Sequence, residues 1–413
     1  MKDSKTGKSR IALALAGGGP LGAIHEIGAL CALEEALGGL DFAALDHYVG
    51  VSAGGFIAAG LANGMRPREL CAAFIENEGA SEVFDPAWLM VPAYGEYARR
   101  AIMAPGLLAR AAWRFSAGRK SLLQAIEGLG PLLPTGVFSS EEVHVRLERL
   151  FSQPGRSNDF RQLRTHLTLV ATNLDSGESA PFGQPGWDHV PISRAVQATA
   201  ALPGLFPPVE IDEHCYVDGA LKKTMHASVA LEDGADLLLC LNPLVPFNAL
   251  EPRAGTMQRG LPAEQRAIPR IADGGLPAVL SQTFRSMIHS RMELGMKQYE
   301  RTYPQADILL FEPDPRDPQL YLANTFSYRQ RRELAEHAYQ ETRRLLRSRR
   351  STLAPTLARH GITLDEAVLD DPRRHLVAPA PERGRFGQAL ATLHEVADDL
   401  GHALRQAEPA RAH

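Results

Sequence analysis

The chain has 413 residues and a formal net charge of −4, and 45% of its residues are hydrophobic while 22% are charged. This balance is ordinary for a globular protein in water, and the weak net charge excludes a general electrostatic attraction to nucleic acid. The length allows one large domain or two medium domains, each with a buried core. Because the four cysteines lie far apart without metal-ligand spacing, we expect reduced and mostly buried thiols.

The first sixteen residues resemble a secretory signal only in part. A basic start precedes the apolar residues 11–16, but that run is short and ends at three glycines and a proline. A signal peptide has a longer apolar region, and no other stretch is long and apolar enough to span a bilayer. We therefore expect a cytoplasmic protein, with peripheral contact with a membrane as an open alternative.

The opening of the chain alternates between strand and helix patterns. Residues 11–16 predict a buried strand, and a glycine-rich loop at 17–22 leads into a helix that ends near Gly38. Residues 47–52 predict a second strand, which turns at once into a second helix near 56–61. Such alternation is typical of a βαβ unit and therefore predicts a largely parallel sheet.

Residues 81–135 have a different character. They are rich in aromatic and other apolar residues, interrupted by prolines and arginines, and show no clean period. One interpretation is a helical layer that covers the core. The other is an apolar cap over an acyl-chain site, because insertions and lids often carry the binding apparatus of an enzyme.

Short strands and helices alternate again after residue 138. We expect helices at 139–151, 191–202 and 228–232, and strands at 166–172, 178–182, 209–211, 215–217 and 236–241. The last of these strands completes the part of the chain that has a clear α/β pattern.

The C-terminal part has weaker patterns. We expect a long connector at 242–275, helices at 279–299 and 327–350, a disordered linker at 369–386 and an amphipathic helix at the end of the chain. Eight arginines between Arg329 and Arg350 predict a solvated helix face. A cationic face that binds anionic lipid head groups is the alternative.

Residues 50–54 have the G-x-S-x-G pattern of a serine nucleophile. A sharp strand-to-helix turn would expose the hydroxyl of Ser52 above the sheet, and glycines at Gly50 and Gly54 allow close backbone packing there. The pattern is short, so an ordinary glycine-rich turn is the alternative.

The loop Gly17-Gly18-Gly19 can supply backbone amides to an oxyanion. It follows the neighbouring strand and begins a helix, where unpaired amides converge. The same loop fits the G-x-G-x-x-G pattern of dinucleotide-binding proteins, so a nucleotide-binding protein is an alternative. The second strand, however, ends in the Ser52 motif and not in the acidic residue that would bind a ribose.

A serine nucleophile also needs a group that accepts its proton. No histidine has a clear context for this role, since His226 follows Asp218 closely and His214 lies in a turn. Asp218 ends a short apolar strand before Gly219 and Ala220, where partial burial would raise its pKa and make it a better base. An ordinary turn aspartate is the alternative.

Together these motifs resemble the patatin-like phospholipases. The matches are the loop at 17–22, the nucleophile turn at 50–54 and the D-G-A box at 218–220, and the segments 173–182 and 198–208 are also similar. The resemblance covers about residues 10–240. It implies a catalytic dyad of Ser52 and Asp218, an oxyanion hole formed by Gly17, Gly18 and Gly19 with the amide of Ala53, and no metal or organic cofactor.

One departure from the family pattern affects specificity. The family loop commonly has a basic residue where this chain has Leu21, so the preference for a lipid head group stays open. The backbone donors of the loop do not depend on that side chain.

We therefore expect a three-layer α/β/α patatin-like domain with a largely parallel central sheet. The expected division is a catalytic domain at 10–245 with an apolar helical insertion at 81–135, a connector and helical extension at 246–350, and a partly disordered tail at 351–413. The expected function is cleavage of lipid or phospholipid carboxylic esters through an acyl-enzyme, without nucleic acid as a partner. A Ser-His-Asp carboxylesterase and a non-catalytic lipid-binding or scaffold protein remain alternatives, and the oligomeric state is not predicted.

Overall fold

The computed structural model of the chain describes residues 8–76, 86–116, 129–250, 270–322 and 328–377. The strands are β1 (Ile11–Leu15), β2 (Leu37–Gly38), β3 (His47–Gly50), β4 (His166–Asn173), β5 (Ser179–Phe182), β6 (Val209–Ile211), β7 (His214–Asp218), β8 (Leu237–Leu241), β9 (Asp307–Phe311) and β10 (Thr363–Leu364). The α-helices are α1 (Gly19–Ala36), α2 (Ala53–Ala62), α3 (Pro67–Cys71), α4 (Tyr94–Ser116), α6 (Glu141–Phe151), α7 (Ile192–Thr199), α8 (Ser228–Glu232), α9 (Gly275–Thr302), α10 (Gln319–Leu322), α11 (Tyr328–Ser348), α12 (Arg350–Ala358) and α13 (Glu366–Asp370).

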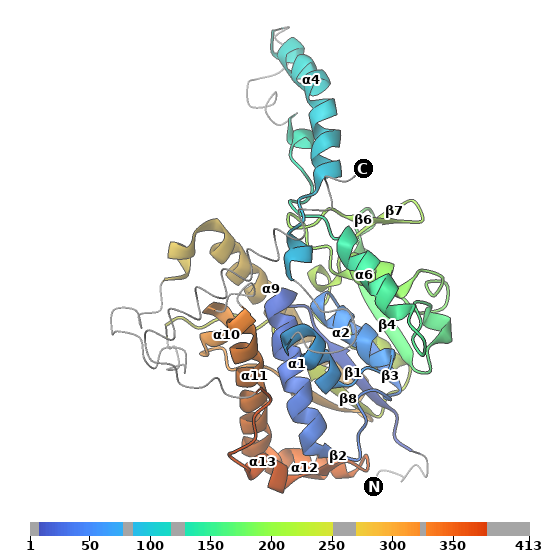
Figure 1. Cartoon of the computed structure of the whole chain (residues 1–413), viewed down its shortest axis with the longest axis vertical. Helices are drawn as coiled ribbons and strands as arrows, with labels where there is room; N and C mark the ends of the chain where they lie inside the picture. The colour runs from blue at the N-terminus through green and yellow to red at the C-terminus, as the bar shows by residue number, and fades with distance from the viewer. Residues whose placement is uncertain (1–7, 77–85, 117–128, 251–269, 323–327, 378–413) are drawn as a thin grey trace, which may run out of the picture. The chain divides into compact units, whose positions relative to one another are not determined.

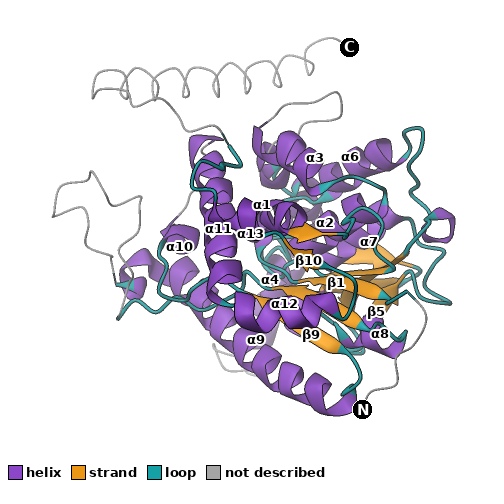
Figure 2. Cartoon of the chain, turned by 90° about the horizontal axis from the view of Figure 1, so that it is seen from below, coloured by secondary structure: helices purple, strands orange, loops and turns teal. Residues whose placement is uncertain are grey.

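A central sheet organises these elements. Its strands follow the order β6-β7-β4-β3-β1-β8-β9, and β5 pairs with β4 outside this path. The neighbours among β4, β3, β1, β8 and β9 are parallel, whereas β5, β6 and β7 pair antiparallel with their neighbours. Helices lie on both sides of the strands, with α1, α3 and α6 on one side and α8 and α9 on the other (Figure 2). The predicted three-layer architecture with a largely parallel sheet is confirmed.

The side chains of β1 show why the sheet needs two helical layers. Ala12 and Ala14 pack on one face in a cluster that includes Leu231 of α8 and Met292 of α9. The alternate residues Leu13 and Leu15 are fully buried on the opposite face, because successive side chains of a strand point to opposite sides. A strand that is apolar on both faces is stable only when helices cover both of them.

The C-terminal part completes this architecture. Strand β9, which the sequence pattern did not predict, pairs parallel with β8 at the edge of the sheet. Helix α11 lies beside α1 (Figures 1 and 2). Gly28 of α1 makes the contact close, since a Cβ there would lie 2.4 Å from the carbonyl oxygen of Ala335 and 2.9 Å from the Cβ of Ala338. The predicted boundary at residue 245 thus falls between two strands that pair in one sheet.

The apolar insertion contains the long helix α4, with Pro105 inside it. The large apolar side chains Ile102, Met103 and Leu108 of this helix are exposed. The helix therefore does not form the layer over the core that one interpretation of the sequence predicted.

The arginine-rich segment has a role that neither interpretation of the sequence predicted. Arg343 is only 1% exposed, and its guanidinium donates to the carbonyl oxygens of Val368, Leu369, Asp371 and Arg374. It thereby fixes the chain after α13 against α11. Several neighbouring arginines also make internal contacts: Arg331 is buried, Arg347 donates to the carbonyl of Leu369, and Arg349 donates to the carbonyl of Leu310.

The linker predicted at 369–386 begins later than expected. Leu369 and Leu376 are buried, and Arg343 binds backbone carbonyls of residues between them, so this segment is fixed up to residue 376. The prediction is wrong for residues 369–376, because proline and arginine content did not reveal that Arg343 binds this stretch. The linker after residue 377 and the predicted terminal amphipathic helix lie outside the described residues.

Two further expectations concern the membrane and the thiols. Within the described ranges, no helix combines the length and the hydropathy that crossing a membrane requires. All four cysteines are free, and Cys31, Cys71 and Cys240 are buried, as predicted.

We predict that Arg343 stabilises the fold much more than its neighbour Arg344. Arg343→Met leaves several buried carbonyl groups without a donor and should lower the free energy of unfolding by about 2–4 kcal/mol. Arg344→Met removes an ion pair between the half-exposed Arg344 and Glu341, and it should change the free energy of unfolding by about 0.5 kcal/mol or less. Urea denaturation of the two variants measures the difference, and equal losses would contradict this role of Arg343.

Candidate active site

Ser52 lies in a strained turn between β3 and α2. Its backbone has φ 55° and ψ −125°, a left-handed φ that is uncommon for a residue with a side chain. The turn is tight because Gly54 packs on β1, where a Cβ would lie 2.4 Å from the carbonyl oxygen of Ala16. Such strain places the side chain above the end of the sheet, as a nucleophile turn requires.

Thr199, at the end of α7, holds this turn. The backbone N–H of Ser52 donates to Oγ1 of Thr199 at 3.0 Å, and the same hydroxyl donates to the carbonyl of Val170 in β4. The motifs did not identify Thr199 as a site residue, although it lies in the segment 198–208 that resembled the family. A threonine at the end of a helix carries no distinctive signal by itself.

The sheet register brings Asp218 to the same place. Leu169 of β4 pairs with Gly50 of β3 and also with β5, so β3 and β5 lie on opposite edges of β4. Two residues later, Ala171 pairs with Asp218 of β7 and also with β5. Because a strand has only two edges, β7 takes the edge of β4 that β3 leaves after Gly50. Asp218 therefore lies about 7 Å along that edge from Gly50, in the direction of Ser52.

Asp218 is buried and firmly oriented. Its backbone N–H donates to the carbonyl of Ala201 at 3.0 Å, and its Oδ1 accepts the N–H of Ala220 at 2.8 Å. Burial raises the pKa of Asp218 to about 6, although hydrogen bonds from the Ala220 amide and the Ser52 side chain act in the opposite direction. The carboxylate is thus ionised at neutral pH and is a stronger base than an exposed aspartate.

The glycine loop lies directly beside Ser52. A Cβ on Gly17 would be 3.1 Å from the Cβ of Ser52, a contact so tight that it would have to displace the Ser52 side chain by a few tenths of an ångström. In the part of the chain that the structure describes, the backbone N–H groups of Gly17, Gly18, Gly19 and Ala53 donate to no other group. Gly19 begins α1 and Ala53 begins α2, where such amides favour a negative charge.

Among the described residues, no histidine has a hydrogen bond to Ser52 or Asp218. His226 contacts the residue after Asp218, with its Nε2 3.3 Å from the carbonyl oxygen of Gly219. Burial lowers the pKa of His226 to about 4, so the ring is neutral at neutral pH.

The pair His25 and Glu26 follows the glycine loop on α1. Burial, with a smaller contribution from His337, lowers the pKa of His25 to about 4. Glu26 is fully buried, and burial raises its pKa well above the ordinary value. The imidazole of His25 is therefore uncharged at neutral pH, and burial favours the uncharged form of Glu26.

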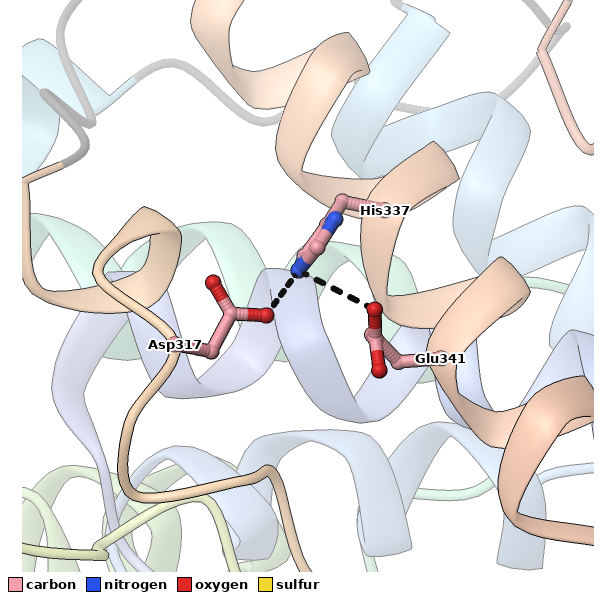
Figure 3. Close-up of side chains that lie close together, drawn as sticks. All are labelled: Asp317, His337 and Glu341. Carbon is pink, nitrogen blue, oxygen red and sulfur yellow. Dashed lines mark hydrogen bonds and ion pairs between the residues drawn. The ribbon is translucent and has the colours of Figure 1, made fainter. Parts of the chain in front are cut away.

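One group of residues has the types that could ligate a metal ion. Asp317, His337 and Glu341 bring their donor atoms within 4.8 Å of one another, and no other such group occurs among the residues described (Figure 3). Nε2 of His337 lies 2.5 Å from the Asp317 carboxylate, and Arg344 pairs with Glu341. Since these contacts join side chains of two segments, we interpret the group as a link between α11 and the chain before α10. None of the three has a hydrogen bond to Ser52 or Asp218.

The site thus brings together Gly17, Ser52 and Asp218, with Gly18 and Gly19 at the start of α1. These five residues are the ones that the sequence motifs selected. The structure adds Thr199 and Ala201, which fix the backbones of Ser52 and Asp218 respectively.

Comparison with known proteins gives two findings. The model of the patatin-like phospholipase family matches residues 13–231, a range that contains Gly17, Ser52, Thr199 and Asp218. Among solved structures, the crystal structure of VipD from Legionella pneumophila is similar, with a TM-score of 0.37 and 18% sequence identity. That alignment covers 83% of this chain and 67% of VipD.

We predict that the hydroxyl of Thr199 is needed to hold Ser52. Thr199→Val keeps the shape but removes the acceptor for the Ser52 amide, so a fluorophosphonate should label Ser52 about tenfold to a hundredfold more slowly. Thr199→Ser keeps the hydroxyl and should label at nearly the original rate. Equal labelling of wild type and Thr199→Val would show that the turn does not depend on this bond.

Proposed function

Because the chain belongs to the patatin-like phospholipase family, we propose that it is a serine lipid acyl hydrolase with Ser52 as nucleophile and Asp218 as general base. The family assigns the chain to the lipid hydrolases. The observation that supports the finer proposal best is the position of a buried carboxylate, Asp218, which the sheet register brings beside the strained turn of Ser52 and whose pKa burial raises to about 6. A base with a pKa near the working pH combines the ionised form with useful proton affinity.

The first half of the proposed reaction forms an acyl-enzyme. Oγ of Ser52 attacks the carbonyl carbon of a lipid ester while its proton passes to the carboxylate of Asp218. The carbonyl oxygen becomes an oxyanion, which the N–H groups of Gly17, Gly18 and Gly19, together with that of Ala53, stabilise. The tetrahedral intermediate collapses, and the leaving alkoxide takes the proton from Asp218.

The second half releases the fatty acid. Asp218 is again ionised and takes a proton from water, which attacks the acyl carbonyl and forms a second oxyanion in the same place. Collapse of this intermediate breaks the bond to Oγ of Ser52, which recovers its proton from Asp218. Each backbone donor to the oxyanion contributes roughly 3 kcal/mol, or about a hundredfold in rate.

The contacts of His226 argue against a Ser-His-Asp mechanism. Its Nε2 is directed to a backbone carbonyl, and its low pKa makes the imidazole a weaker base than Asp218. Free backbone donors beside a strained serine also favour an active site over a vestigial one.

We predict that both members of the pair are essential. Ser52→Ala should abolish hydrolysis, and Asp218→Asn should lower kcat by roughly 10²–10⁴-fold because it removes the general base. The assay uses phospholipids and lysophospholipids in detergent micelles, with mass-spectrometric detection of the released fatty acid. Micelles present the lipid without requiring the enzyme to bind a bilayer.

Matched controls come from an exposed turn of the same protein. Asp175 and Ser176 lie between β4 and β5, and Asp175→Asn and Ser176→Ala should keep full activity. Undiminished hydrolysis by Ser52→Ala or Asp218→Asn would disprove the assignment. The distribution of products across the lipid panel identifies the acyl position that is cleaved.

A further inference from the structure

Exposed apolar side chains gather on a few segments of this protein. Apart from Leu174, Leu250 and Leu294, the exposed large apolar residues of the described chain lie on α4 and the turn before it, on the first half of α9, and in loops 130–138 and 202–206. Six of these exposed residues are Ile102 and Leu108 of α4, Leu202 and Leu205 of the loop after α7, and Phe284 and Met287 of α9. We call these six residues the apolar rim.

One side of the apolar rim is connected to Asp218 through backbone hydrogen bonds. Ala201, whose carbonyl accepts the N–H of Asp218, directly precedes Leu202. The carbonyl of Leu205 accepts the N–H of Val137 at 3.0 Å, and the carbonyl of Val137 accepts the hydroxyl of Tyr97 at 2.6 Å. The first turns of α4 are therefore attached to the loop that orients Asp218.

The other side of the apolar rim adjoins Ser52. Ile288 of α9 packs on Val51 and Ala220, the neighbours of Ser52 and of the Asp218 turn. Phe284 lies about one helical turn before Ile288, Met287 directly precedes it, and both side chains are exposed. The apolar rim thus reaches the candidate active site from two directions.

Helix α4 does not bury its apolar residues. Glu96 and Arg100, in its first two turns, attach it to Thr135 and Pro131. Further along, Ile102 is 81% exposed and Leu108 is 51% exposed. Exposed apolar groups that gather on one element indicate a surface that binds something apolar.

The charge of α4 indicates which kind of apolar partner this surface binds. From Tyr97 to its end the helix contains arginines and neither aspartate nor glutamate. At 100° per residue, Arg99, Arg100 and Arg110 fall within one sector of about 100°, which Met103 shares, while Ile102 and Leu108 fall outside it. A helix that gathers its arginines on one side and exposes apolar residues around them is suited to the interface of an anionic membrane.

We propose that α4 and the apolar rim form a surface that binds anionic lipid bilayers next to Ser52. The apolar residues enter the interface, and the exposed Arg110 pairs with anionic head groups, whereas Arg99 and Arg100 pair with Glu96 of the same helix. Delivery of a membrane lipid to Ser52 rests on the proposed function, whereas binding to the bilayer does not.

The test is co-sedimentation of the full chain with phosphatidylcholine vesicles, with and without phosphatidylglycerol. Arg110→Gln should weaken binding to phosphatidylglycerol vesicles about fivefold and leave binding to pure phosphatidylcholine unchanged. Ile102→Gln combined with Leu108→Gln should weaken binding to both kinds of vesicle by about tenfold or more. Both changes keep good helix formers on α4.

Two matched controls lie outside the surface. Leu174 is 52% exposed, close to the 51% of Leu108, and Leu174→Gln should bind as the wild type does. Arg350, a half-exposed arginine on α12, serves as the control for Arg110, and Arg350→Gln should also leave binding unchanged. The proposal is overturned when the wild type fails to sediment with anionic vesicles, or when the controls lose as much binding as the α4 variants.

Two more readouts distinguish a bilayer-binding surface from a catalytic defect and from a dimer interface. On a soluble short-chain ester the α4 variants should keep the wild-type rate, whereas on vesicles their rate should fall with binding. If the wild type hydrolyses the soluble ester but does not bind vesicles, the proposed bilayer-binding surface is wrong and the proposed function stands. If it binds vesicles but hydrolyses no ester, the proposed function is wrong and the surface stands. A wild-type dimer in light scattering that dissociates in the Ile102→Gln, Leu108→Gln variant would assign this surface to a second copy of the chain and overturn the proposal.

Discussion

The backbone of Ser52 is the constraint on which the site depends. A non-glycine residue at φ 55° costs about 1–3 kcal/mol and persists only when its surroundings fix it. Here the fixing group is Thr199, which binds the Ser52 amide and is itself bound to Val170 of β4. Two residues later, Ala201 accepts the amide of Asp218. The end of α7 therefore sets the positions of both groups that the proposed reaction uses.

Burial of Asp218 links the chemistry of the site to the stability of the fold. The pKa of Asp218 rises from 3.8 to about 6, so the folded state holds this proton more tightly than the unfolded state does. The stabilisation is complete below pH about 4 and is lost as the pH rises toward 6. At neutral pH the ionised carboxylate then costs about 3 kcal/mol. The form that can act as a base is thus the less stable one, and the hydrogen bonds of Ala220 and Ser52 offset only part of this cost.

The local motifs selected the residues that the structure brings together at the candidate site. Gly54 packs closely on the backbone of Leu15 and Ala16, and Gly17 lies close to the side chain of Ser52, and such constraints leave a short pattern in the sequence. Ser52 and Asp218 are 166 residues apart in the sequence, and the register of β3, β4 and β7 brings them close together. The order of the motifs was consistent with this proximity, but only the pairing of the strands explains it. The sequence did not identify Thr199, because its role depends on a contact with Ser52, which is far away in the chain.

The parts that the sequence did not predict share a physical cause. Strand β9 is a short apolar segment beyond a long connector, and only its pairing with β8 distinguishes it from an ordinary loop. Arg343 resembles its exposed neighbours in composition, yet it binds four backbone carbonyls that arrive later in the chain. Gly28 gave no sign that α11 would pack on it. Each of these contacts is formed between distant segments, so no local pattern encodes it.

In the proposed mechanism Asp218, and not a histidine, takes the proton of Ser52. The pH dependence of kcat/KM on a soluble short-chain ester tests it most directly, because it reports the ionisation of the free enzyme. Activity should rise with pH through an apparent pKa of about 6, with the same midpoint in the wild type and in His226→Asn, a replacement that tolerates the positive φ of that position. Loss of activity in His226→Asn, together with an unchanged profile in Asp218→Asn, would contradict the account.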